Sequence, residues 1–144
     1  MSSTDRKLPA ADPAAAERTV LERTVLALSQ GPYVARLEPP GADHQSLDRH
    51  APGTAESRER LAHTGERRAW AAEDAAQAAQ AALAGAVRAY VYALRVTGFR
   101  LGGVLAAVAS TVRESVAPTI SVGALDGVLR DAGQYGVEAY FARR

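Results

Sequence analysis

The chain contains no cysteine, and this absence removes several classes of function at once. Disulfide bonds, thiolate catalysis and cysteine-based zinc sites all need a thiolate sulfur, so they are excluded. Aromatic residues are also scarce, with one Trp, two Phe and five Tyr among 144 residues. Because alanine supplies much of the 47% hydrophobic content, we expect a thin core that self-association or a partner protein would help to stabilise.

The chain also lacks a strong charge of either sign. Seventeen basic and 16 acidic residues give a formal net charge of +1, so we expect no general attraction to nucleic acid or to acidic membranes. Long hydrophobic runs are missing as well. The longest uncharged runs, Ala75–Val87 and Leu101–Val112, are shorter than the roughly 20 residues that cross a bilayer. With no apolar stretch near the N-terminus, these features predict a cytoplasmic protein without a membrane span.

Residues that carry catalysis are few. No histidine follows His63, and His44 and His50 lie in a Pro/Gly-rich stretch with a spacing that fits no helix or hairpin metal site. Asp126 and Asp131 are five residues apart, so on a helix they point in different directions and do not form a carboxylate pair. We therefore expect no enzyme activity, no cofactor, no metal and no small-molecule substrate.

The segment from Leu83 to Val116 carries the strongest structural signal. Two apolar stripes with helical spacing follow one another in it, comprising first Leu83, Val87, Tyr90, Val91 and Leu94, and then Leu101, Val104, Leu105, Val108 and Val112. Gly98 is suited to end the first helix in a left-handed conformation, and Pro118 prevents the second from continuing. The pattern predicts two antiparallel helices joined by a tight turn around Thr97–Phe99.

A third helix is predicted over Val122–Phe141, with Ser121 as its N-cap residue. Gly133 and Gly136 each cost about 1 kcal/mol relative to alanine inside a helix. Their presence indicates either a close crossing with another helix or a kink.

Upstream, the alanine-rich run Ala71–Ala82 follows Trp70 and strongly favours a helix, which can continue without a break to Thr97, although Gly65 is a possible break before it. Asp12-Pro13 is a good helix start, and Gly31-Pro32 is a stop. The expected organisation is a disordered tail over 1–12, an N-terminal helix over 13–30 that is loosely attached, a flexible linker over 31–53 and a helical bundle domain over 54–144. The order of Tyr33–Leu37 is left open.

The predicted fold class is therefore all-α: a small bundle of one long helix and two shorter C-terminal helices, with an N-terminal helix on a Pro/Gly-rich linker. The function that this pattern favours is non-catalytic protein–protein interaction, with itself or with another protein. Tyr92, Phe99 and Tyr135 lie off the apolar stripes or in the turn, so they are the candidate contact residues. The alternative is that they are partly buried aromatics at the rim of the core.

A DNA-binding regulator with a helix-turn-helix-like C-terminal part is the second hypothesis. Its would-be recognition helix, residues 121–144, holds Arg130 against Asp126, Asp131 and Glu138 before the last two arginines. A helix that enters a groove between phosphates should be basic, so nucleic acid is an unlikely partner on this evidence.

Overall fold

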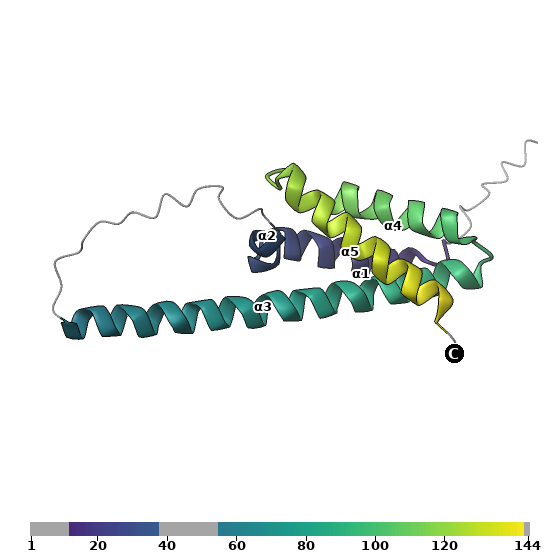
Figure 1. Cartoon of the computed structure of the whole chain (residues 1–144). Coiled ribbons are helices and arrows are strands. Elements are labelled where there is room, and N and C mark those ends of the chain that lie inside the picture. Colours follow the sequence, from purple (N-terminus) through teal and green to yellow (C-terminus); the bar gives the residue numbers. More distant parts are fainter. Residues whose placement is uncertain (1–11, 38–54, 143–144) are drawn as a thin grey trace, which may run out of the picture.

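The computed structural model describes residues 12–37 and 55–142, and within these ranges it is all α-helical. Five helices run in the order α1 (Ala15–Ser29), α2 (Pro32–Leu37), α3 (Ala55–Val96), α4 (Leu101–Ser115) and α5 (Val122–Phe141). Figure 1 shows α3 as one long rod, with the other helices gathered along the part that ends at its C-terminus. The predicted all-α bundle with one long helix is confirmed.

The long helix passes through Gly65 without interruption and spans 42 residues. It ends where the sequence predicts, because Gly98 takes a φ of 94° that closes the helix, and α4 begins three residues later. The backbone N–H of Phe99 donates to the carbonyl of Leu94, which satisfies one of the free carbonyl groups in the last turn. The two predicted antiparallel helices and their tight turn are therefore present.

The helix α5 begins and ends at the predicted residues. The hydroxyl of Ser121 accepts a hydrogen bond from the N–H of Ala124 at 3.1 Å, which is the expected N-cap. Gly136 is buried, and a Cβ atom added there would lie 3.1 Å from Cδ2 of Leu105. The glycine thus allows a close crossing with α4, which is one of the two alternatives that the sequence left open. At Gly133 a Cβ atom would meet nothing within 4 Å.

The N-terminal helix α1 is an integral part of the core. Leu21 and Val25 are fully buried and Leu28 is nearly so. At the end of α1 the buried hydroxyl of Ser29 accepts the N–H of Ala117 at 3.0 Å, which ties α1 to the link between α4 and α5. The prediction of a loosely attached helix is therefore wrong, because the narrow stripe of α1 packs on α3 and α4 instead of resting on the surface.

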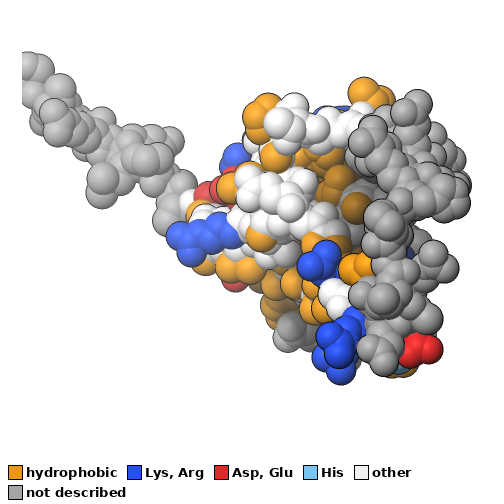
Figure 2. Space-filling view, turned by 90° about the vertical axis from the view of Figure 1, so that its left-hand side faces the viewer, with side chains coloured by type: hydrophobic (Ala, Val, Ile, Leu, Met, Phe, Trp, Pro, Cys, Tyr) orange, Lys and Arg blue, Asp and Glu red, His pale blue; other side chains and the backbone are white. Residues whose placement is uncertain are grey.

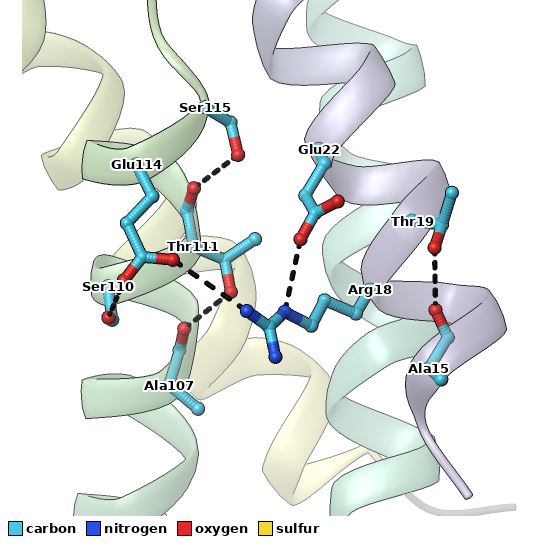
Figure 3. Close-up of polar contacts among 9 residues, drawn as sticks. All are labelled: Ala15, Arg18, Thr19, Glu22, Ala107, Ser110, Thr111, Glu114 and Ser115. Carbon is cyan, nitrogen blue, oxygen red and sulfur yellow. Dashed lines mark hydrogen bonds and ion pairs between the residues drawn. The ribbon is translucent and has the colours of Figure 1, made fainter. Parts of the chain in front are cut away.

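Polar contacts add to this packing between α1 and α4. Figure 3 shows the guanidinium of Arg18 between two carboxylates, Glu22 of its own helix at 3.1 Å and Glu114 of α4 at 3.7 Å. The three side chains are 41–62% exposed, so each of these ion pairs contributes little to stability.

The short helix α2 occupies the first part of the stretch that the sequence assigned to a flexible linker. Tyr33 and Val34 are buried, and the Tyr33 hydroxyl donates a hydrogen bond to Asp131 of α5. Gly127 of α5 leaves room for the Leu37 side chain, which lies 3.1 Å from the position of an added Cβ. The linker prediction is therefore wrong for residues 32–37, because Pro32 starts a new helix here. Residues 38–53, the predicted tail as far as residue 11, and His44 and His50 lie outside the described residues.

Candidate functional site

The N-terminal half of α3 buries none of its described side chains, and Glu73 near the end of this half forms an exposed ion pair with Arg36 of α2 at 3.3 Å. Every side chain from Glu59 to Ala75 is exposed, and the buried positions of α3 begin at Ala76. Figure 1 shows this half extending beyond the other helices. It carries two large apolar side chains, Leu61 with 65% and Trp70 with 75% of its surface exposed. Figure 2, viewed from the end at which α3 begins, shows hydrophobic and basic side chains side by side there.

Trp70 begins a line of exposed residues that runs along the outer side of α3 as far as Tyr92. The steps along this line are three or four residues, the spacing of neighbours on one face of a helix. We call it the outward face of α3; it comprises Trp70, Asp74, Ala78, Ala81, Gly85, Arg88 and Tyr92, all exposed. Between its aromatic ends the face is built mainly from small residues, so another helix can approach it closely.

Two shallow hollows lie on this face, one near each end. The Trp70 hollow is lined by His63, Glu66, Arg67, Trp70, Ala71 and Asp74. The Tyr92 hollow is lined by Glu17, Gly85, Arg88, Ala89, Tyr92, Arg95, Ala139 and Ala142. The second hollow is therefore lined mostly by α3, with one residue from α1 and one from α5 beside it.

The charges near the outward face differ in how far the chain itself satisfies them. Arg95 donates to the carbonyl of Ala142 at 3.2 Å and lies over the ring of Tyr140, with 5.7 Å to the centroid. Asp74 and Arg88, in contrast, form no ion pair with any residue of the described ranges. The outward face thus presents one carboxylate and one guanidinium that form no ion pair within the described residues.

The structure places the three predicted contact residues in different settings. Tyr92 is 41% exposed on the outward face, and Phe99 is 47% exposed in the turn after α3, where one carbon of its ring lies 3.3 Å from the position of a Cβ atom added at Gly103. Tyr135 is half-buried, and its hydroxyl accepts the amide N–H of Gln80 at 2.9 Å across the contact of α3 with α5. Tyr135 also borders a small hollow that shares Arg88 with the Tyr92 hollow, so these two tyrosines lie near one another.

Sequence reasoning misses Trp70 as a surface residue. Tryptophan is usually at least partly buried, and only the packing shows that every side chain from Glu59 to Ala75 stays exposed. One signal was present in the sequence: Trp70, Asp74, Arg88 and Tyr92 share a helical face that lies opposite the apolar stripe beginning at Leu83.

The described residues also show what kinds of chemistry the fold assembles. They contain no group of three or more His, Asp or Glu side chains that could hold a metal ion. No helix among them combines the length and the apolar character needed to cross a membrane. Burial and the hydrogen bond to Asp131 raise the pKa of the Tyr33 hydroxyl well above its usual value, but this group joins α2 to α5 in the core and lines none of the hollows described above.

Comparison of the chain with family models, with curated proteins and with solved structures finds no match.

Proposed function

We propose that this protein is a non-catalytic helical interaction module that contacts a protein partner, either another copy or a different chain, through the outward face of α3. The main support is Trp70, a large apolar side chain that is 75% exposed in the half of α3 that buries none of its described side chains. Tryptophan, tyrosine and arginine are the residues most often found at the energetic centres of protein interfaces. The outward face carries one of each, at Trp70, Tyr92 and Arg88.

Phe99 extends the proposed contact surface beyond the end of α3. Tyr135 has a supporting position in this proposal, because its hydrogen bond to Gln80 holds α5 beside α3 and so fixes one wall of the Tyr92 hollow. We expect the module to act in the cytoplasm, as its composition suggests.

A DNA-binding regulator receives less support from the same observations. One side of α5, the would-be recognition helix, is occupied by contacts with α3 and α4. The charged residues on the rest of its described length are Arg130 against Asp126, Asp131 and Glu138. A groove between phosphates would repel such a surface.

The test compares two alanine-to-arginine variants. Ala81 lies at the middle of the outward face, and Ala106 is an exposed alanine on α4. Arginine is a good helix former, so neither substitution should disturb the fold. Wild type, Ala81→Arg and Ala106→Arg are each measured by multi-angle light scattering and then used for affinity purification from the native host with mass spectrometry.

We expect Ala81→Arg to lose an associated protein, either further copies of the chain or a different one, that wild type and Ala106→Arg both retain. A monodisperse wild-type monomer at high concentration, together with the same captured proteins for both variants, would contradict the proposed function.

A further inference from the structure

We infer that the partner on the outward face is a second copy of this chain, with the two α3 helices antiparallel and crossing at Ala81. The inference rests on the proposed function and goes beyond it by naming the occupant and its orientation. It follows from a symmetry in the outward face itself, because a two-fold dimer must use one surface that complements its own copy.

The outward face is self-complementary about Ala81. Asp74 lies seven residues before Ala81 and Arg88 seven residues after it. Trp70 lies eleven residues before Ala81 and Tyr92 eleven residues after it. Seven and eleven residues are close to two and three whole helical turns, so all five side chains lie on one side of α3.

An antiparallel second helix centred on Ala81 brings unlike groups together. It places Asp74 opposite Arg88 of the second copy and Trp70 opposite Tyr92 of the second copy, and symmetry gives each contact twice. At the centre Ala81 faces Ala81 of the second copy, flanked by Ala78 and Gly85, and such small side chains allow helix axes to come within about 8 Å. Asp74 and Arg88, which form no ion pair within the described residues, thus neutralise one another across the contact.

The hollows fit the same arrangement. When Trp70 lies opposite Tyr92 of the second copy, its indole ring reaches the Tyr92 hollow, which contains Arg88 and Arg95. Arginine side chains over an indole face are favourable neighbours. One carboxylate oxygen of Glu17 at that hollow is buried and has no hydrogen-bond partner, and an indole N–H is a donor of the required kind.

A parallel pair would not have these contacts. In a parallel two-fold dimer each residue faces its own copy, so Asp74 would meet Asp74 and Arg88 would meet Arg88 of the second copy. Like charges at both places would oppose association, so the charge pattern itself selects the antiparallel orientation.

The test uses two single charge reversals in the full chain, Asp74→Arg and Arg88→Asp. Both positions are exposed and form no ion pair within the described chain, so each variant should keep its fold by circular dichroism. Sedimentation equilibrium at low salt should show a wild-type dimer and, for each variant alone, a dissociation constant weaker by about tenfold or more, because two attractive pairs become two repulsive ones. An equimolar mixture of the two variants should restore a dimer, since the mixed dimer contains two opposite-charge pairs. Reversal of Asp126, an exposed acid on α5 that lines none of the hollows described above, to Arg is the matched control and should leave the wild-type dimer intact.

Three results would overturn the inference. The first is a wild-type dimer that neither reversal weakens, and the second is a pair of variants whose mixture forms no stronger dimer than each variant alone. Either result would place self-association on another surface, without contradicting the proposed contact between the outward face and a different protein. A wild-type monomer at high concentration would exclude the second copy as partner; the proposed function would then still be tested by host proteins whose capture depends on Ala81.

Discussion

The two halves of α3 differ so much in packing that the same substitution should cost several kcal/mol of stability in one half and almost none in the other. Leu83 is fully buried in the hydrophobic core, whereas Leu61 is 65% exposed. Replacing Leu83 by Ala removes three carbon atoms from the core, which costs roughly 2.5 kcal/mol of transfer free energy at about 0.8 kcal/mol per carbon. The cavity left behind adds to this, so the expected loss is about 3–5 kcal/mol. Such a loss is a large fraction of the roughly 5–15 kcal/mol typical of a domain.

Leu61→Ala is the internal control. Little apolar surface leaves the protein at this position, and alanine is a slightly better helix former, so the change should stay within about 0.5 kcal/mol. Urea denaturation followed by circular dichroism at a fixed protein concentration measures both free energies of unfolding. Equal losses for the two variants, or a loss below about 1 kcal/mol for Leu83→Ala, would refute the division of α3 into a core half and a free half.

Three further predictions concern the contacts that hold the bundle. Ser29→Ala should cost about 1–3 kcal/mol in urea denaturation, because the N–H of Ala117 loses its acceptor in a buried position; no change would mean that the bridge is replaced by water. The raised pKa of Tyr33 means that folding favours its neutral form, so this contribution to stability is present below the ordinary value of 10.0 and decreases as the pH rises above it. Thermal melts between pH 8 and 11 should show that decrease, Tyr33→Phe should reduce it, and an identical slope in both proteins would contradict the assignment. Gly98→Ala should destabilise the protein by about 1 kcal/mol in the same urea assay, because a φ of 94° strains any residue with a Cβ. A stabilised variant would show that residue 98 can leave this backbone conformation without cost.

Much of the fold could be predicted from the sequence, because the helices carry local signals. The bounds of α5 follow from Ser121 and from the apolar spacing, and the turn after α3 follows from Gly98. The role of α1 could not be predicted in this way. Its narrow stripe and the proline at position 32 suggested a loose attachment, and only the tertiary packing of Leu21 and Val25 shows that it completes the core.

The candidate site was predictable only in part. Tyr92 and Phe99 were identified because they lie off an apolar stripe, and both are exposed. Trp70 was missed, because a helix pattern alone does not tell which half of a 42-residue helix the rest of the chain covers. The symmetric spacing about Ala81 becomes informative only once the exposed side of α3 is known.

The most direct test of the antiparallel pairing is a pair of distances between spin labels in the dimer. Because the chain has no cysteine, a single one can be introduced at Gln77 or at Ala62, both exposed. Gln77 lies four residues from Ala81 and Ala62 nineteen, so an antiparallel dimer separates the two labels by eight and by 38 residues along the helices. At 1.5 Å per residue these are about 12 Å and about 57 Å. Electron–electron double resonance should therefore give a short distance between the labels at Gln77 and a long one at Ala62. Short distances at both positions would contradict the antiparallel pairing.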